Sequence, residues 1–384
     1  MLKKFIMKNF KNFEDEISIN FQDTAGYQFN MDCISRDMIS KMLIYGRNAT
    51  GKTNLGKALM DIRGTLFGRP ASLQEGFFLN ADSPDDAAAF SYAFQFDEHE
   101  LIYRYELFSD MHLKKEELVI DERLIYQFDF FKKAYNFDNL VYVGAETANT
   151  ERYLESLEKG EMAEEIEGRG LPFFRWLINN VALKSDSLLL RLADYIQKME
   201  MITLKDDAVS KKRGKYERFL ERLEDAAELS DFEEFLNMMG IKCKLILKEL
   251  PDGQRELYFE HGRLLPFYEN ASSGTRALTA LYRGFIAVAK KTSFLYLDEF
   301  DAFYHYEMAD NVIKFLKNKY SECQIIMTSH NTNLMTNRLM RPDCLFILSE
   351  KGKLTALCNA TLRELREGHN LEKMYISGEF ARYE

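Results

Sequence analysis

The stretch Met42-Leu43-Ile44-Tyr45, followed by Gly46-Arg47-Asn48-Ala49-Thr50-Gly51-Lys52-Thr53, decides the fold of this chain. Four apolar residues that run into a glycine predict a short buried β-strand. Over residues 55–67 the apolar residues recur at helical spacing, and the Gly-Arg-Pro run at 68–70 ends that pattern. A strand, a glycine-bounded loop ending in Gly-Lys-Thr and a helix match the full phosphate-binding loop pattern. An ordinary glycine turn would not be expected to match this pattern at all eight positions and also in the strand and helix on either side.

The chemistry of this loop explains its spacing. Glycines at both ends let the backbone fold tightly, so that successive N–H groups and the helix N-terminus face a phosphate. Lys52 would reach the β- and γ-phosphates, and the Thr53 hydroxyl would bind magnesium. The loop alone does not choose among families of nucleotide hydrolases. We predict that ATP is bound by Gly46, Arg47, Asn48, Ala49, Thr50, Gly51, Lys52, Thr53 and Asn54.

A second apolar strand delivers an acidic pair. Residues 294–297 (Phe-Leu-Tyr-Leu) run into Asp298 and Glu299, and ligands bind at the carboxyl ends of strands in open α/β sheets. Asp298 would hold Mg²⁺ through water, and Glu299 would be the general base that polarises the attacking water. Alone, such a pair is more often a solvated strand end. Together with the loop at 46–53 it indicates a hydrolytic site.

Two further segments have the composition of a phosphate site. The run Ala271-Ser272-Ser273-Gly274-Thr275 precedes a helical pattern over residues 276–290, and small residues at a helix start either cap the helix or form an anion site. Residues 324–327 predict another buried strand, which continues to His330 before a helix that opens at Asn331. A lone histidine is usually structural. Because this one follows a strand expected to lie beside the acidic strand, we predict that it contacts the γ-phosphate and senses hydrolysis.

The remaining patterns set the domain organisation. Period-two alternation predicts an N-terminal antiparallel sheet with strands at 2–7, 17–21, 90–96, 101–108, 117–121 and 123–128. Residues 150–236 are rich in Glu, Lys, Leu, Met and Arg and predict a helical block. Strand-like runs return at 241–247 and 256–260, and apolar strands then alternate with helices. We expect an α/β fold with an N-terminal antiparallel β-lobe, a parallel core sheet and a helical insertion, divided into residues 1–148, 149–240 and 241–384.

Composition narrows the class of protein. The net charge of -10 argues against a chain that coats nucleic acid non-specifically. Five cysteines show no CxxC spacing, which favours reduced, buried thiols and a cytoplasmic protein. The N-terminus lacks the apolar core of a signal peptide, and no apolar run approaches the roughly 18 residues of a membrane span.

Taken in chain order, the phosphate loop, the long insertion, the 271–275 segment, the acidic strand and His330 resemble the ABC-type ATPase heads of SMC and RecF-like proteins. More narrowly, the chain is similar to the compact AAA family ATPases of bacterial abortive-infection and anti-phage systems. This resemblance is carried by SSGT at 272–275, DEFDAFYH at 298–305, TSHNTNLM at 328–335 and REGHNLEKMYISGEF at 366–380. It implies a split ATPase head with a RecA-like core, and the helical block adds nothing to it.

The resemblance also implies roles for individual residues. Lys11 and Asn12 would lie near the nucleotide base, and Asp301 would begin the D-loop. The glutamine of the Q-loop has no clear match, and Gln95 and Gln127 are both open candidates. The signature motif, which contacts the γ-phosphate bound by a second copy, would comprise Ser272, Ser273 and Gly274.

These features predict an ATPase that uses ATP and Mg²⁺, with Lys52, Glu299 and His330 as catalytic residues. Two copies would dimerise head to head through ATP. The first hypothesis for its role is regulation of a separate effector, a nuclease or toxin, in bacterial anti-phage defence. The alternative is a RecF- or SMC-like DNA-repair or DNA-clamping ATPase, in which the basic run at 211–215 touches DNA phosphates. Such a run is more often a solvated loop. A scaffold with little turnover is a third option, against which Glu299 argues.

Overall fold

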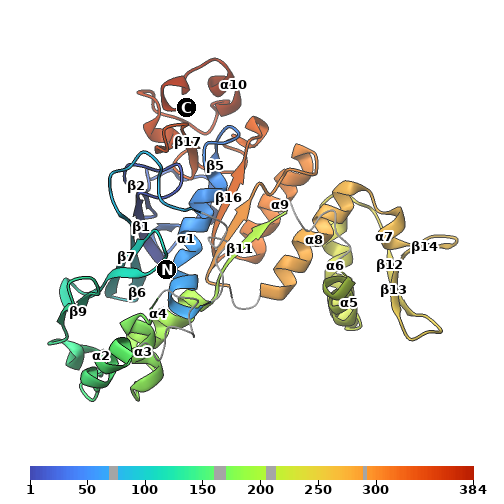
Figure 1. Cartoon of the computed structure of the whole chain (residues 1–384). Coiled ribbons are helices and arrows are strands. Elements are labelled where there is room, and N and C mark those ends of the chain that lie inside the picture. Colours follow the sequence, from blue (N-terminus) through green and yellow to red (C-terminus); the bar gives the residue numbers. More distant parts are fainter. Residues whose placement is uncertain (69–76, 160–169, 205–212, 289–291) are drawn as a thin grey trace.

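The computed structural model of this chain describes residues 1–68, 77–159, 170–204, 213–288 and 292–384. Within these ranges the chain builds an antiparallel β-lobe, a mostly parallel core sheet and a smaller unit that projects from the core (Figure 1). The expected α/β architecture, with an N-terminal β-lobe and a parallel core, is confirmed.

The β-lobe is a seven-stranded sheet with the strand order β10-β9-β8-β7-β6-β1-β2. Its strands are β1 (Leu2–Lys8), β2 (Ile17–Asn20), β6 (Ala87–Phe96), β7 (His99–Phe108), β8 (Leu113–Ile120), β9 (Arg123–Asp129) and β10 (Ala134–Asn136). Along β7, Leu101, Tyr103, Tyr105 and Leu107 are buried and the residues between them are at least partly exposed. This is the alternation expected of a strand with one face on the core.

The core sheet has the order β11-β15-β16-β5-β17-β18, in which only the β17–β18 pair is antiparallel. Its strands are β5 (Lys41–Tyr45), β11 (Met199–Thr203), β15 (Phe294–Asp298), β16 (Gln324–Ser329), β17 (Leu345–Leu348) and β18 (Leu354–Ala356). Strand β5 therefore lies between β16 and β17, which come from the last fifth of the chain. The central strands β15 and β16 are buried along their whole length.

Helix α1 (Lys52–Phe67) lies between the two sheets (Figure 1). On one side Tyr92 of the β-lobe donates its hydroxyl to the Ala58 carbonyl at 2.8 Å, and Tyr105 donates to the buried Asp61 carboxylate at 2.8 Å. On the other side Gly56 packs directly on the Tyr296 ring of β15. The helix that follows the phosphate loop is thus held by both layers.

The segment predicted as a helical block contains one strand that the sequence did not reveal. Helices α2 (Thr150–Lys159), α3 (Phe173–Asn180), α4 (Leu188–Gln197), α5 (Arg213–Arg222) and α6 (Ala226–Met238) do lie there. However, β11 pairs residue by residue with β15 and forms the edge of the core sheet. Its sequence Met-Glu-Met-Ile-Thr has the composition of the neighbouring helices, so pairing with β15 decides its structure. The division of the chain at residues 148 and 240 stays a prediction.

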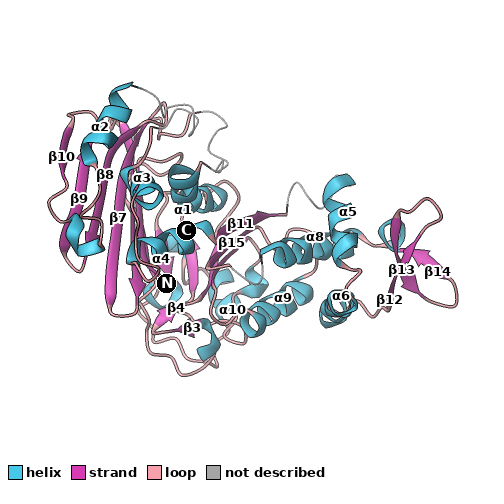
Figure 2. Cartoon of the chain, turned by 90° about the horizontal axis from the view of Figure 1, so that it is seen from below, coloured by secondary structure: helices cyan, strands magenta, loops and turns pink. Residues whose placement is uncertain are grey.

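A small three-stranded sheet projects beyond α5 and α6 (Figures 1 and 2). It comprises β12 (Leu245–Glu249), β13 (Arg255–Glu260) and β14 (Leu264–Pro266), and the chain returns to the core through α7 (Phe267–Asn270) and α8 (Ser273–Val288). The predicted strand at 241–247 starts only at Leu245. A turn at 252–253 joins β12 to β13 and is closed by the Gly253 N–H, which donates to the Leu250 carbonyl.

The last elements are α9 (Tyr306–Lys319) and α10 (Leu371–Ile376), with short 3₁₀ turns between and after them. All five cysteines are free; three are buried, and Cys243 and Cys358 are partly exposed. Among the residues that the structure describes, no helix combines the length and apolar character needed to span a bilayer.

Candidate functional site

The loop between β5 and α1 has the backbone of a phosphate cradle. Ala49 and Gly51 adopt positive φ angles of 67° and 100°, which turn successive N–H groups toward the inside of the loop. A Cβ on Gly46 would lie 2.6 Å from Thr50 Oγ1 and 3.2 Å from the Leu348 carbonyl, so only glycine fits there. The spacing of the motif is therefore explained by the path of the backbone.

The Lys52 ammonium lies inside this loop. It donates to the Gly46 carbonyl at 2.6 Å and to the Arg47 carbonyl at 3.0 Å, and its side chain is only 4% exposed. A buried ammonium held by backbone carbonyls can exchange them for phosphate oxygens, with which it forms stronger, charge-assisted bonds.

Asn12 supports the loop from the β-lobe. Its Nδ2 donates to the Thr50 carbonyl at 3.1 Å, and its Oδ1 accepts from Asn54 at 2.8 Å. The neighbouring Lys11 donates to the Phe77 carbonyl at 2.9 Å, and burial, followed by the charge of Lys57, lowers its pKa. Asn12 thus lies directly against the loop, while its contact with a nucleotide base stays a prediction, as does that of Lys11.

The acidic strand meets the start of α1. Thr53 Oγ1 donates to Asp298 Oδ2 at 2.8 Å, and Thr328 Oγ1 donates to Asp298 Oδ1 at 3.1 Å. Asp298 has no exposed surface. A hydroxyl and a carboxylate side by side are the oxygen donors that Mg²⁺ takes from proteins, which usually supply one or two ligands and leave the rest to phosphate and water. The donor set therefore fits magnesium.

The chain turns sharply at Glu299, directly after β15. Glu299 has a φ of 46°, and its N–H donates to Thr328 Oγ1 at 2.8 Å. A left-handed backbone is unusual for a residue with a side chain, and such residues concentrate at functional sites. The turn brings the Glu299 carboxylate to the same sheet edge as Asp298.

Strand β16 ends beside this turn at Ser329, and His330 follows it. Ser329 donates to Asp301 Oδ2 at 2.7 Å and accepts the Asn331 N–H at 2.9 Å. Burial raises the pKa of Asp301, and the Ser329 bond opposes that shift. The side chain of His330 is exposed. The helix predicted to open at Asn331 is a 3₁₀ turn, Thr332–Leu334, capped by the Asn331 side chain.

The 271–275 segment forms an N-cap, and its two serines are exposed, as His330 is. Ser272 Oγ accepts the Thr275 N–H at 3.1 Å, which is the bond of a helix cap. Ser272 and Ser273 are exposed, and a Cβ built on Gly274 would lie 3.5 Å from the Phe303 carbonyl. The segment therefore caps α8 and lies beside the chain that follows the acidic pair. Its contact with a nucleotide stays a prediction.

The C-terminal segment reaches the phosphate loop, which the sequence did not predict. Arg47 forms an ion pair with Glu384, and the rings of Tyr45 and Tyr375 lie edge to face at 4.8 Å. Tyr375 belongs to the phrase at 366–380 that carries the resemblance to anti-phage ATPases. The structure places that phrase at the mouth of the loop, next to the second residue of the motif.

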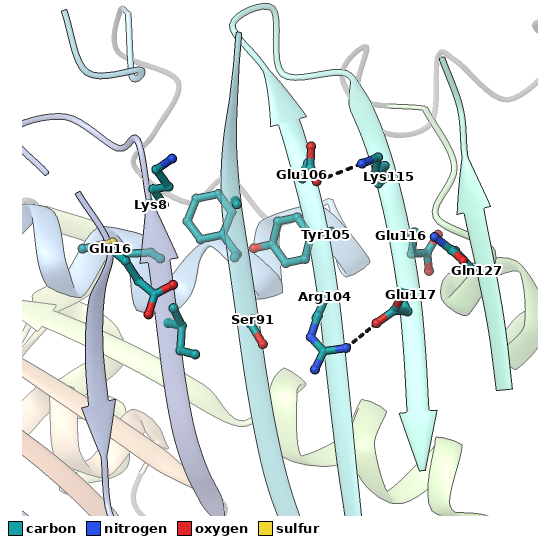
Figure 3. Close-up of a pocket in the computed structure, with 14 residues that line it drawn as sticks. Lys8, Glu16, Ser91, Arg104, Tyr105, Glu106, Lys115, Glu116, Glu117 and Gln127 are labelled. Carbon is teal, nitrogen blue, oxygen red and sulfur yellow. Dashed lines mark hydrogen bonds and ion pairs between the residues drawn. The ribbon is translucent and has the colours of Figure 1, made fainter. Parts of the chain in front are cut away.

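The two glutamines considered for the Q-loop lie elsewhere. Gln95 lies at the end of β6, where its backbone pairs with Met1, directly before the start of β1. Asn12, which contacts the phosphate loop, lies beyond the other end of β1, so Gln95 is at the far end of that strand from the loop. Gln127 is exposed on the outer face of the β-lobe, where it lines a shallow pocket (Figure 3). Four of the charged residues that line it form two ion pairs, Arg104 with Glu117 and Lys115 with Glu106. The D-loop candidate Asp301, in contrast, lies beside the acidic pair.

The strand, loop and helix around Lys52, met by the acidic end of β15, have the arrangement of a P-loop nucleotide-binding head. A sequence model of one family matches residues 41–336. The chain belongs to that family, which is described as "AAA domain, putative AbiEii toxin, Type IV TA system".

Solved structures with some likeness to the chain are heads of SMC proteins. One is an SMC head bound to the C-terminal winged-helix domain of ScpA, with 18% identity, a TM-score of 0.47, and coverage of 90% of this chain and 93% of that chain. Another is the Thermotoga maritima SMC head, with 16% identity, a TM-score of 0.44, and coverage of 90% and 94%. A third, from Pyrococcus furiosus, has 16% identity, a TM-score of 0.45 and coverage of 99% of both chains. Likeness at this level carries no argument about activity or partners. No curated protein matches the chain.

Proposed function

We propose that this chain binds ATP with Mg²⁺ and hydrolyses it, and that two copies join head to head around the nucleotide. The observation that supports this most is the 2.8 Å bond between Thr53 and Asp298. These residues are 245 positions apart in the chain. Their meeting beside the buried Lys52 ammonium supports a phosphate-transfer site at this sheet edge.

The side chains have separate roles in this proposal. Lys52 leaves the loop carbonyls and holds the β- and γ-phosphates, while the loop N–H groups bind phosphate oxygens. Bound Mg²⁺, held by Thr53 and Asp298, supplies positive charge beside the transferring phosphate. Glu299 accepts the proton of the attacking water, and His330 contacts the γ-phosphate.

The exposed signature segment supports a dimer. Ser272 and Ser273 offer hydroxyls at the N-terminus of the 16-residue helix α8, where partial positive charge favours an anion. In the head-to-head arrangement they bind the γ-phosphate held by the second copy. Each site is complete only in the dimer, so that hydrolysis loosens the pair.

For the cellular role we propose regulation of a separate cytoplasmic effector, a nuclease or toxin, in defence against phage. The description of the family, which names a toxin of a toxin–antitoxin system, supports this role over DNA repair. The basic run at 211–215, on which a DNA-clamping role would depend, includes residues outside the described ranges, and its remaining side chains are not described.

Three proteins test the enzymatic part of the proposal: wild type, Lys52→Ala and Glu299→Gln. Wild type should release phosphate from ATP in the presence of Mg²⁺. Lys52→Ala should weaken ATP binding in calorimetry by about 10- to 100-fold, because it removes a charged bond to phosphate. Glu299→Gln should bind ATP normally and hydrolyse it about 10²- to 10⁴-fold more slowly.

The same variants test the dimer. On gel filtration with light scattering, Glu299→Gln with ATP should have twice the mass of the Lys52→Ala control. A Glu299→Gln protein that binds ATP and stays monomeric would rule out the head-to-head arrangement. Tight, salt-sensitive binding of a short DNA duplex that ATP strengthens and Lys211→Glu with Lys212→Glu abolishes would favour the DNA-clamping role instead.

A further inference from the structure

Thr328 is the last but one residue of β16 and touches both members of the acidic pair. Its side chain has no exposed surface. Its hydroxyl donates to Asp298 Oδ1 at 3.1 Å and accepts the Glu299 N–H at 2.8 Å. One hydroxyl can donate one bond and accept two, so this group uses its single proton on one acidic residue and a lone pair on the next.

These two bonds replace the ladder between β15 and β16. Regular pairing of the two strands extends to Leu297 opposite Met327. Beyond it, the Glu299 N–H turns to the Thr328 hydroxyl, and the Phe300 N–H reaches the Thr328 carbonyl at 3.3 Å. The positive φ of Glu299, 46°, arises at this departure from the strand. A strained backbone persists only where its surroundings hold it, and Thr328 supplies the hydrogen bond that holds this one.

The same hydroxyl also orients the Asp298 carboxylate. Asp298 Oδ2 accepts from Thr53 and Asp298 Oδ1 accepts from Thr328, so the two bonds fix the rotation of the carboxylate in its plane. Hydrogen bonds from behind a metal ligand set its direction and commonly change metal affinity or activity by about 10- to 100-fold when they are lost.

We infer that Thr328 is a positioning residue that aims Asp298 at the metal and Glu299 at the attacking water. The inference rests on the proposed hydrolysis of ATP with Mg²⁺ and gives a role to Thr328, for which neither the phosphate-loop pattern nor the resemblance implies one. In this role Thr328 would contact neither phosphate nor water. It acts by holding two neighbours, one through its side chain and the other through its backbone.

The chain offers variants that separate this role from packing. Thr328→Val keeps the shape and removes the hydroxyl, whereas Thr328→Ser keeps the hydroxyl and removes the methyl group. A matched control is Thr65→Val, because Thr65 is also fully buried and donates to a buried carboxylate, Asp61 Oδ2, at 3.0 Å. Thr65 lies near the far end of α1, away from Lys52.

The experiment measures three quantities for each protein: phosphate release against Mg²⁺ concentration, ATP affinity with Mg²⁺ and with EDTA, and melting temperature. We expect Thr328→Val to lower kcat by about 10- to 100-fold and to need more Mg²⁺ for half-maximal rate. It should also lose part of the gain in ATP affinity that Mg²⁺ gives, while its affinity in EDTA is unchanged. Thr328→Ser should stay within a few-fold of wild type. Thr65→Val should lower the melting temperature and leave the Mg²⁺ dependence as in wild type.

The outcomes distinguish the inference from the proposed function. If wild type neither binds nor hydrolyses ATP, the proposed function fails and the inference fails with it. If wild type is active and Thr328→Val has the same kcat and Mg²⁺ dependence, the inference alone is overturned. The same holds if Thr328→Ser is as impaired as Thr328→Val, or if Thr65→Val also needs more Mg²⁺ for half-maximal rate, because the effect would then come from packing.

Discussion

Replacing Gly56 with alanine should separate the phosphate-loop helix from the acidic strand. Gly56 lies one turn into α1, directly over the Tyr296 ring of β15, two residues before Asp298. A Cβ at this position would lie 2.4 Å from Tyr296 Cε1 and 2.6 Å from Cδ1. Because carbon atoms pack at roughly 3.5 Å or more, either the ring or the helix must move by about 1 Å.

The ring has little freedom to yield. Tyr296 is fully buried, and its hydroxyl donates to the Lys52 carbonyl at 2.5 Å. We therefore expect the helix to shift and the Thr53–Asp298 distance to grow from 2.8 Å to nearly 4 Å. Overpacking of this kind lowers the free energy of unfolding by about 1–3 kcal/mol. The higher helix propensity of alanine relative to glycine offsets about 1 kcal/mol of this loss. A 1 Å displacement of reacting groups can slow a reaction by about 100-fold.

Gly284→Ala is the matched control. Gly284 is also inside a helix, but its nearest neighbour, at 2.9 Å, is Ile202 Cδ1, the free end of a flexible side chain. Both substitutions gain the same helix propensity, so a difference in melting temperature between the two variants reports the clash with Tyr296 alone. Melting temperature and Mg²⁺-dependent phosphate release should both fall in Gly56→Ala relative to Gly284→Ala. A Gly56→Ala protein that melts with its control and hydrolyses ATP at the wild-type rate would refute the reasoning.

Three other perturbations test single contacts. Burial raises the pKa of Glu116, which accepts bonds from the Phe173 and Phe174 N–H groups. Below pH 4.5 the carboxyl is protonated in both the folded and the unfolded protein, and its contribution to the free energy of unfolding is complete. That contribution is lost as the pH rises through the pKa of the folded state. Melting temperature should fall over that window in wild type and not in Glu116→Gln; parallel profiles would contradict this. Glu384→Gln frees Arg47 and should raise ATP affinity by about 1.5- to fivefold, since exposed ion pairs are weak; unchanged affinity in calorimetry would mean that Arg47 does not reach the nucleotide. Gly51→Ala should abolish ATP binding, because its Cβ would lie 2.4 Å from Asn12 Nδ2 at a φ of 100°; normal binding would show that the loop tolerates another path.

The sequence correctly predicts those features whose pattern lies within one short stretch of residues. The loop at 46–53 and the acidic end of β15 each follow an apolar run, and their chemistry has meaning only if they meet. The bond from Thr53 to Asp298 shows that they do. The alternation in β6 and β7 likewise predicted a sheet with one buried face, and both strands lie within a residue or three of the expected positions.

The missed features depend on contacts that no local pattern encodes. Strand β11 has five residues with helix-like composition, and only its neighbour β15 makes it a strand. Glu384 meets Arg47 across almost the whole chain. Thr328 opens the TSHNTNLM run, but a threonine near a strand end is common, and the sequence predicts no role for it. The available signal was its place beside the acidic strand, two residues before His330.

The order of strands in the core sheet also bears on how the protein is made. Strand β5 is complete when the ribosome has passed Tyr45, yet its neighbours β16 and β17 begin at Gln324 and Leu345. At ~5–20 residues per second, translation needs roughly 15–55 s to supply the first of them. Throughout that time a buried, apolar strand has no sheet to join and is exposed to aggregation. Nascent chains stalled before Gln324 should therefore depend on chaperones and lack the protease resistance of the finished head.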